Sequence, residues 1–185
     1  MADSKIPTYI RFSAYINQKS IEALMGAIQQ ELAQGVRHFV ILISSEGGFV
    51  DWGVTAYNFL RGIPAEVETH NYGIVDSVAV ILYCVGKKRY SAPHARFGMH
   101  GVGFTLSKDT RFEEKQLDNK IKSLRRSTEK IAGLIAENTG KSKEEIKKAM
   151  YDVTTLNAKQ AVEFGLTHEI KAELFESGAK VITIS

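Results

Sequence analysis

The 185 residues suit a single domain, which at this size buries roughly 70% of the surface that its unfolded chain exposes. Apolar residues make up 44% and charged residues 24%, which is ordinary for a soluble globular protein. The 24 basic and 21 acidic residues are interspersed, a pattern that favours solvated helices and argues against a nucleic-acid partner. One cysteine, Cys84, excludes a disulfide framework.

The sequence shows no secretory signal and no membrane span. Residues 1–7 lack the apolar core of a signal peptide. The longest apolar run, residues 78–85, is far shorter than the roughly 20 residues needed to cross a bilayer. Cys84 lies inside this run, where we expect it to pack in the core in a reducing compartment. We therefore expect a cytoplasmic protein without a membrane partner.

The first half of the chain alternates between predicted strands and helices. Residues 8–12 predict a strand, and Ser20 is expected to cap a helix that Gly35 ends. Residues 36–44 form an unbroken apolar run, which is typical of a strand buried on both faces. Further helices are predicted at 50–60 and 78–85, and further strands at 65–71, 89–91 and 96–100. This alternation predicts a layered α/β fold built from βαβ units, with ligands at the carboxyl ends of the strands.

A long helix with one narrow apolar edge is predicted at 112–138. The apolar residues are spaced alternately by four and three, as in a coiled-coil seam. They are Leu117, Ile121, Leu124, Thr128, Ile131 and Ile135. The helix either projects from the domain to meet another subunit or packs on the sheet, and the pattern does not separate these alternatives.

The last part of the chain predicts two short helices and two strands. Ser142 and Glu145 form a capping box for a helix that ends near Met150. Asp152 is expected in a loop, followed by a helix at 157–164. Strands are predicted at 167–172 and 181–184.

A serine, a histidine and a glycine pair are predicted to meet at strand ends. Ser77 begins a helix and His100 ends a strand, while Gly47 and Gly48 follow an apolar strand. Alone, each has an ordinary structural interpretation, namely a helix cap, a strand-end histidine and a turn. Together they suit acyl transfer, because a histidine activates the hydroxyl and backbone N–H groups stabilise the oxyanion.

The ordered combination resembles the ClpP family of Clp-type serine proteases. The family's strand followed by Ser-Pro-Gly-Gly is matched by Ile43-Ser44-Ser45-Glu46-Gly47-Gly48, and its Gly-x-x-x-Ser motif by Gly73-Ile74-Val75-Asp76-Ser77. Its base follows a proline turn, as Met99-His100 follows Pro93 here. The segment from Ala158 to Leu166 is similar to the family's Ala-x-x-Ala-x-x-Tyr-Gly-Leu. The likeness covers residues 6–170.

The resemblance implies one crotonase-like α/β domain over residues 1–185, with a protruding handle at about 101–138 that interlocks two stacked rings. It implies a Ser-His-Asp triad with Ser77 as nucleophile and His100 as base. The oxyanion hole would be formed by the N–H groups of Gly48 and Val78. Peptide would add as a strand beside Gly101, Val102, Gly103 and Phe104, and beside the loop of Gly47 and Phe49.

The acid of the triad is the least defined member. A gapless match backwards from Ala158 puts Val153 at the family's aspartate position and Asp152 one residue away. A one-residue bulge would bring Asp152 into place. Otherwise the site is a dyad, or Asp152 acts from a shifted position, and Asp118 is a poorer candidate.

Other positions depart from the family pattern. Glu46 replaces a proline, and Asp76 stands directly before the nucleophile, where the family has a small residue. A carboxylate there would raise the pKa of His100 or repel the oxyanion if it pointed inward, and we expect it to face away. The first strand starts within about ten residues, so the family's axial loop and first helix are expected to be missing. That argues against coupling to a Clp ATPase.

The predicted function is a serine endopeptidase that acts on peptides or unfolded proteins inside a self-assembled homo-oligomeric ring, with no cofactor and no metal. One alternative is a catalytically impaired ring subunit that assembles with an active paralogue. Another is an acyl-CoA enzyme of the crotonase type, although that chemistry does not need Ser77 and His100. A Ser-Lys site would require a lysine beside Ser77, and the sequence indicates none.

Overall fold

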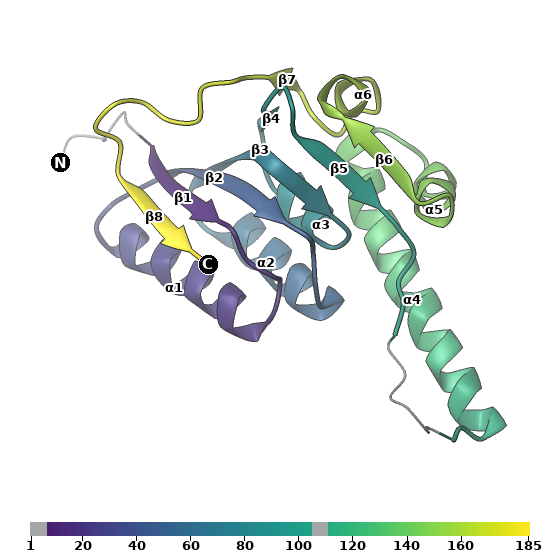
Figure 1. Ribbon diagram of the computed structural model, residues 1–185. Coiled ribbons are helices and arrows are strands. Elements are labelled where there is room, and N and C mark those ends of the chain that lie inside the picture. The colour runs from purple at the N-terminus through teal and green to yellow at the C-terminus, as the bar shows by residue number, and fades with distance from the viewer. Residues whose placement is uncertain (1–6, 105–110) are drawn as a thin grey trace.

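The computed structural model describes residues 7–104 and 111–185, which form a twisted β-sheet with helices packed against it (Figure 1). The sheet order is β6-β5-β3-β2-β1-β8, with β4 pairing β3 and β7 pairing β4. The strands are β1 Thr8–Phe12, β2 His38–Ser45, β3 Glu66–Asp76, β4 Arg89–Ser91, β5 Arg96–Met99, β6 Thr154–Asn157, β7 Glu169–Ile170 and β8 Val181–Ile184. The helices are α1 Gln18–Ala33, α2 Val50–Gly62, α3 Ala79–Cys84, α4 Glu114–Thr139, α5 Lys143–Tyr151 and α6 Ala158–Glu163.

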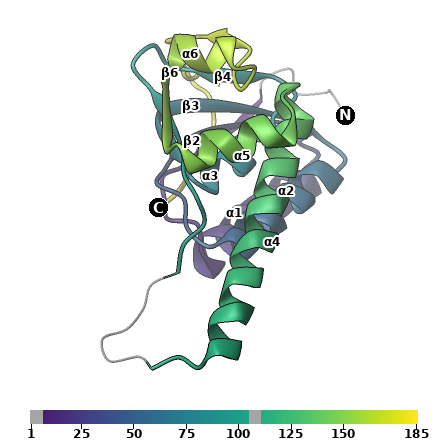
Figure 2. The ribbon, with the colours of Figure 1, turned by 90° about the vertical axis from the view of Figure 1, so that its right-hand side faces the viewer.

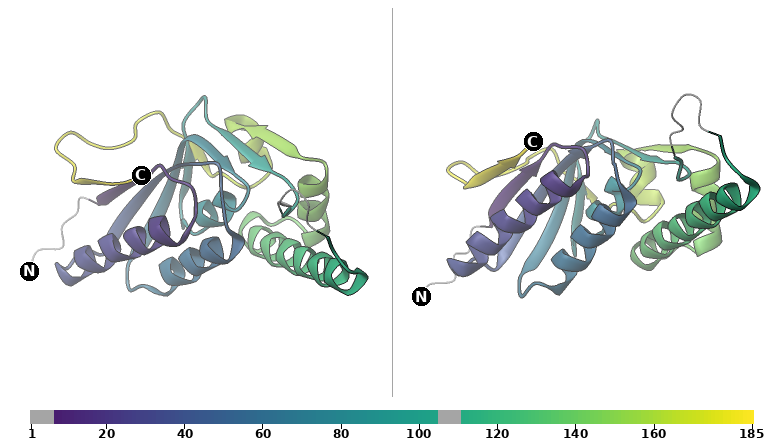
Figure 3. Two further views of the ribbon diagram at one scale, coloured as in Figure 1. Left: turned by 60° about the horizontal axis from the view of Figure 1, so that its bottom comes forward. Right: turned by 90° about the horizontal axis from the view of Figure 1, so that it is seen from below.

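The main core lies between the sheet and the helices α1, α2 and α3, which cover one of its faces (Figures 1 and 3). On α1 the buried residues Ile21, Leu24 and Ile28 recur at helical spacing and face the sheet. All residues of α3 are buried, including Cys84, and burial raises the pKa of this thiol to about 12. The layered α/β fold is therefore confirmed, and Cys84 packs in the core as predicted.

The strand β3 is longer than predicted because it has two successive neighbours along one edge. Its residues Thr69–Asn71 pair with β4, and Ile74–Asp76 pair with β5. Asn71 lies at the change of partner, where its buried side chain donates to the carbonyl of Arg96 and accepts from the N–H of Gly73. Every strand pair is parallel except β5 with β6.

The other face of the sheet carries a smaller apolar cluster. Tyr9, Val40 and Leu42 are buried there beneath Leu174 and Ala179. The segment after β7 thus covers this face before β8 adds to the edge of the sheet beside β1. Lys180 anchors it through an ion pair with the buried carboxylate of Glu31 on α1.

The long helix α4 leaves the body of the molecule (Figures 1 and 2). Ile131 and Ile135, in its C-terminal half, are buried against the core, whereas Leu117 and Ile121 are 42% and 44% exposed. The C-terminal half of the seam therefore packs on the core, the N-terminal half projects with its apolar edge exposed, and its contact with another subunit stays a prediction. No helix in the described part of the chain is long and apolar enough to span a membrane.

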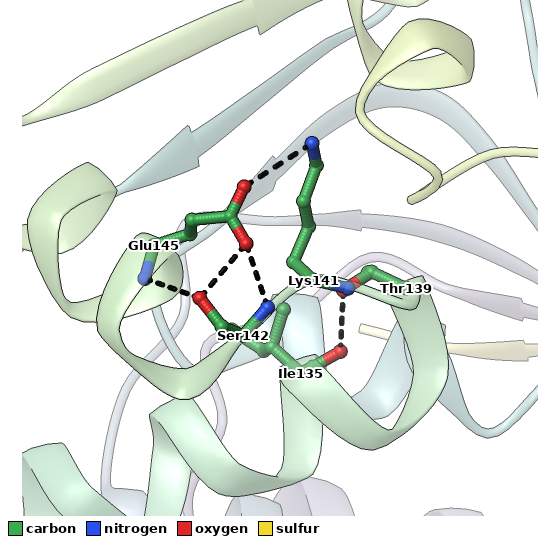
Figure 4. Close-up of polar contacts among 5 residues, drawn as sticks. All are labelled: Ile135, Thr139, Lys141, Ser142 and Glu145. Atoms are coloured by element: carbon green, nitrogen blue, oxygen red, sulfur yellow. Dashed lines mark hydrogen bonds and ion pairs between the residues drawn. The ribbon is translucent and has the colours of Figure 1, made fainter.

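The turn between α4 and α5 is held by the predicted capping box (Figure 4). The hydroxyl of Ser142 accepts from the N–H of Glu145, and the Glu145 carboxylate accepts from the N–H of Ser142. Lys141 lies 3.5 Å from the same carboxylate. Thr139, the last residue of α4, donates its hydroxyl to the carbonyl of Ile135, and Gly140 ends the helix in a left-handed conformation.

Three local predictions were wrong. The cap of α1 is Asn17, and Ser20 is the third helical residue of its capping box. Ser77 does not cap α3, which has Val78 at that position and no side-chain cap. The strand β6 was missed because it has only four residues, of which only Leu156 is buried, so it gives no apolar alternation.

Candidate active site

Three neighbouring strands bring the predicted residues to one edge of the sheet. The chain leaves β2 towards Gly47 and Gly48, leaves β3 at Ser77, and leaves β5 at His100. Because β2, β3 and β5 are adjacent and parallel, their carboxyl ends meet at the same edge. The ladder ends with Asp76 opposite Gly98, so Ser77 and His100 follow directly on neighbouring strands.

Ser77 lies in a strained turn between a strand and a helix. Its φ angle is +58°, a left-handed conformation that costs a residue with a side chain roughly 1–3 kcal/mol. The turn is fixed because the N–H of Ser77 donates to the carbonyl of Gly98 at 2.8 Å, and its carbonyl accepts from Val80. Such a turn presents the side chain at the sheet edge instead of folding it back onto the helix, so the structure argues against the helix-cap interpretation.

The backbone N–H groups of Gly48 and Val78 belong to residues that neighbour this serine. Within the described residues, neither Gly48 nor Val78 donates its N–H to a backbone hydrogen bond. The Gly48 peptide is held from both sides, because Ile16 donates to the carbonyl of Gly47 at 2.7 Å and accepts from Phe49 at 2.9 Å. Fixed, unpaired donors of this kind are what an oxyanion requires.

The close approach of the glycine loop to the serine needs glycine at position 47. Its φ angle is +96°, and a Cβ there would lie 2.8 Å from Cβ of Ser77 and 3.3 Å from the nitrogen of Val78. On the other side, a Cβ on Gly53 of α2 would lie 2.3 Å from a methyl group of Val78. Gly47 and Gly53, which lack side chains, therefore leave the space in which Val78 and its N–H group lie.

The His100 ring is exposed and bound to the main chain. Its Nδ1 lies 2.8 Å from the carbonyl oxygen of Gly101. A carbonyl only accepts, so Nδ1 carries the proton and Nε2 of the neutral ring is left as an acceptor. That is the tautomer a general base needs. Among the described residues Ser77 and His100 do not hydrogen-bond each other, and catalytic contacts are often long before substrate binds.

The acid position is occupied by an apolar residue. The antiparallel ladder pairs Met99 with Thr154, so its continuation puts Val153 across from His100. Val153 is 67% exposed and has a φ angle of +53°. Asp152 is the C-cap of α5, and its carboxylate forms an ion pair with Lys148. Its role as the third triad member stays a prediction.

The side chain of Asp76 forms an ion pair with Arg96. The Arg96 guanidinium lies 3.2 Å and 3.0 Å from the two carboxylate oxygens, across the β3–β5 ladder. Gly98 makes room for this carboxylate, because a Cβ there would lie 2.3 Å from Oδ1 of Asp76. No local sequence pattern indicates Arg96, since the two residues are twenty positions apart and meet only through strand pairing.

The predicted substrate-binding residues border the same edge. Phe49 is 60% exposed and packs edge-to-face on the exposed ring of Tyr15, with ring centroids 5.9 Å apart. Residues 101–104 continue from His100 without regular structure, and Val102 contacts the core. No strand is formed by Gly101 or Gly103 themselves, and their pairing with a peptide stays a prediction.

Comparison with known proteins agrees with this geometry. The Clp protease family model matches residues 9–173. "ATP-dependent Clp protease proteolytic subunit 1" from Chlamydia muridarum is 30% identical over 162 residues, covering 85% of this chain and 82% of its own. "ATP-dependent Clp protease proteolytic subunit 1" from Corynebacterium jeikeium is 31% identical over 147 residues, covering 76% and 74%. A mutant of ClpP1 from Listeria monocytogenes superposes with a TM-score of 0.80 at 26% identity, covering 89% and 91%.

The chain belongs to the Clp protease family. This confirms the family that the motifs at Gly47, Ser77, His100 and Ala158 indicated. It also confirms the predicted class of enzyme, a serine peptidase.

Proposed function

We propose that the protein is a serine endopeptidase of the Clp type, with Ser77 as nucleophile and His100 as general base. The observation that carries the proposal is the strained turn at Ser77, which lies beside the two unpaired N–H groups of Gly48 and Val78. A strained residue is retained where the surrounding structure holds it in place, and such residues cluster at active sites.

The reaction follows from the positions of these groups. As Ser77 Oγ attacks the peptide carbonyl, Nε2 of His100 takes its proton. The carbonyl oxygen becomes an oxyanion that accepts from the N–H groups of Gly48 and Val78. The imidazolium then protonates the leaving amine, and an acyl-enzyme remains on Ser77. A water molecule, deprotonated by the same histidine, then attacks the acyl-enzyme. This releases the new carboxyl end of the cleaved peptide and restores Ser77.

The Gly101 carbonyl has one of the functions of a triad acid, which is to orient the histidine ring. By accepting from Nδ1 at 2.8 Å it fixes the ring and the tautomer. It carries only a partial charge, so it stabilises the imidazolium less than a carboxylate does. For Asp152 to act instead, its carboxylate has to leave Lys148 and the loop at Val153 has to shift. We therefore propose an enzyme whose default state is a dyad.

Assembly is proposed through the handle, α4. Leu117 and Ile121 form an exposed apolar edge on the half of α4 that leaves the body. A second copy that covers this edge would remove it from water, as the ring-stacking arrangement requires. Enclosure in a stacked ring and a cytoplasmic location are also part of the proposal, whereas coupling to a Clp ATPase is not.

A fluorophosphonate probe tests the nucleophile directly. Wild-type protein, assembled and at neutral pH, should be labelled once per chain, and mass spectrometry should place the label on Ser77. The Ser77→Ala protein should not react. Ser177→Ala is the matched control, because Ser177 is exposed in the segment before β8 and should leave labelling unchanged. Failure of the wild-type assembly to react would overturn the hydrolase proposal.

A second candidate is a ring subunit that contributes little activity of its own. It is favoured by the ion pair between Asp152 and Lys148 and by Val153 at the position across from His100. Co-purification in mixed rings with an active Clp-type subunit would support it, and robust peptide cleavage by the pure protein would exclude it. Calorimetric binding of an acyl-CoA would instead support the crotonase alternative.

A further inference from the structure

A histidine and two glutamates gather at the amino-terminal ends of β2 and β3. His38 and Glu66 are paired residues of the two strands, and Glu68 lies two residues along β3 on the same face. One ligand-type atom from each lies within 4.8 Å of the others. Glu68 is nine residues before Ser77, which at strand spacing is roughly 30 Å, so this cluster belongs to the opposite edge of the sheet.

The cluster holds polar groups that the described protein atoms leave unsatisfied. The Nε2 atom of His38 is buried and has no hydrogen-bond partner in the described chain. Glu68 is only 8% exposed, yet its ion pairs to His38 and Lys88 are 3.6 Å and 3.8 Å long, both beyond hydrogen-bond length. The Glu68 carboxylate thus has no hydrogen bond from the described protein atoms, and the buried, orphaned nitrogen of His38 is costly.

The surrounding charges leave the cluster negative. Two carboxylates face one partly exposed histidine and one lysine, Lys88, whose side chain is 63% exposed. Burial raises the pKa of the Tyr90 phenol, the charge of Glu68 raises it further, and Lys88 lowers it. The two carboxylates therefore outnumber the one lysine beside Glu68.

We propose that His38, Glu66 and Glu68 bind one divalent transition-metal ion, with zinc as the best fit. Imidazole nitrogen with carboxylate oxygen suits zinc, and three protein ligands plus one water complete a tetrahedron. Bonds of about 2.1 Å put ligand atoms roughly 3.4 Å apart, close to the 3.6 Å between His38 and Glu68. Glu66 is exposed and free to turn inward. The ion joins β2 to β3 and has a structural role, because it is too far from Ser77 to act on substrate.

Titration of the metal-free full-length protein tests this. After EDTA treatment and dialysis, zinc chloride should bind with one equivalent per chain by calorimetry, and the Tm should rise by several degrees. Cobalt(II) should give the visible absorption of a tetrahedral ion. Magnesium chloride should do neither. Absence of zinc binding, or magnesium binding in its place, would overturn the proposal.

Variants locate the ion. His38→Ala and Glu68→Gln should each weaken zinc binding by at least about tenfold. The matched controls His94→Ala and Glu163→Gln change an exposed histidine and an exposed glutamate elsewhere and should bind as wild type does. If Glu68→Gln does not fold, His38→Ala decides, because His38 is partly exposed at the first position of β2.

One further variant separates this site from the candidate active site. Zinc bound at His100 would be lost in His100→Ala and retained in His38→Ala, and that result would overturn the proposal. The opposite pattern supports it. Because the readouts are binding, absorption and Tm, the outcome does not depend on whether the protein cleaves peptides.

Discussion

Arg96 binds both carboxylate oxygens of Asp76, the residue immediately before Ser77. This ion pair neutralises a negative charge one residue from the proposed nucleophile, where an uncompensated carboxylate would oppose the developing oxyanion of the proposed mechanism. We predict that Arg96→Ala lowers kcat/KM for peptide cleavage by about tenfold or more. Fluorophosphonate labelling rates measure the same effect without a chosen peptide.

The double variant Arg96→Ala/Asp76→Asn provides the control for charge. If the freed carboxylate causes the loss, removing its charge should restore most of the labelling rate. A double variant as slow as Arg96→Ala alone would mean that the guanidinium acts by holding β3 and β5 together. In that case both variants should have a lower Tm than wild type.

Gly47→Ala should inactivate the enzyme while most of the fold survives. The added methyl would overlap Cβ of Ser77 at 2.8 Å, and the φ angle of +96° is poor for alanine. We expect a stability loss of about 1–3 kcal/mol by chemical denaturation and a labelling rate reduced by about a hundredfold. Gly62→Ala is the control, because a Cβ on Gly62 meets no atom within 4 Å. Normal labelling of Gly47→Ala would refute the proposed role of this loop.

Val153→Asp should increase activity. The position lies across from His100, and aspartate tolerates the left-handed φ of +53° better than a β-branched side chain does. A carboxylate there can accept from Nδ1 in place of the Gly101 carbonyl and stabilise the imidazolium. We expect kcat to rise by about tenfold.

Val153→Asn separates charge from strain. It should relieve the same backbone strain and stabilise the protein by about 1 kcal/mol, without the gain in kcat. Asp152→Asn completes the set. If it abolishes activity in the wild-type background, Asp152 is the acid and the dyad is wrong.

The contact between α4 and α5 should weaken in acid. Glu129 is bound by Lys143 and Lys147, and these hydrogen bonds lower its pKa from 4.5 to about 2. A lowered carboxyl pKa stabilises the fold above the ordinary value, and this stabilisation is lost as the pH falls from about 4.5 to about 2. Denaturation between pH 6 and 2 should show the loss in wild type but not in Glu129→Gln. Glu137→Gln, an exposed change on the same helix, should behave as wild type, and salt should reduce the effect.

Ile121→Glu should reduce assembly. A charge on the exposed half of α4 would be buried without a partner at the proposed interface. Analytical ultracentrifugation should show smaller particles, with the Tm of the smaller species unchanged. Lys122→Glu also places a glutamate on this helix at an exposed residue, but outside the apolar edge, and should assemble normally. Equal assembly of both variants would exclude this edge as the contact.

Much of the fold was predictable from local patterns. The unbroken apolar run of β2, the helical spacing on α1 and the capping box at Ser142 each express a single physical rule in a few residues. Some failures were local, such as the choice of Ser20 over Asn17 as the cap of α1, but the length of β3 depended on a distant partner. β3 extends to Asp76 because β5 pairs with its second half, and no window around residues 72–76 contains that information.

The candidate site likewise has features that the sequence predicts and features that only strand pairing determines. That Ser77, His100 and the glycine pair lie at strand ends on one edge was predictable, because the strand–helix alternation indicated a parallel sheet whose strand ends meet. The ion pair between Arg96 and Asp76 and the strain at Val153 were not, because both arise from the register of β5 with its two neighbours. The gapless match did indicate position 153, and the ladder now gives that position a physical meaning.

The pairing of β1 with β8 bears on how the protein is made. Tyr9 and its neighbours leave the ribosome well before their edge partner around Val181, which is about 170 residues further along the chain. Until then, the apolar face of Tyr9, Val40 and Leu42 has no cover from Leu174 or Ala179. Contacts this distant in sequence form slowly, and an uncovered strand edge invites aggregation. The nascent chain should therefore need chaperone protection until the residues of β8 emerge.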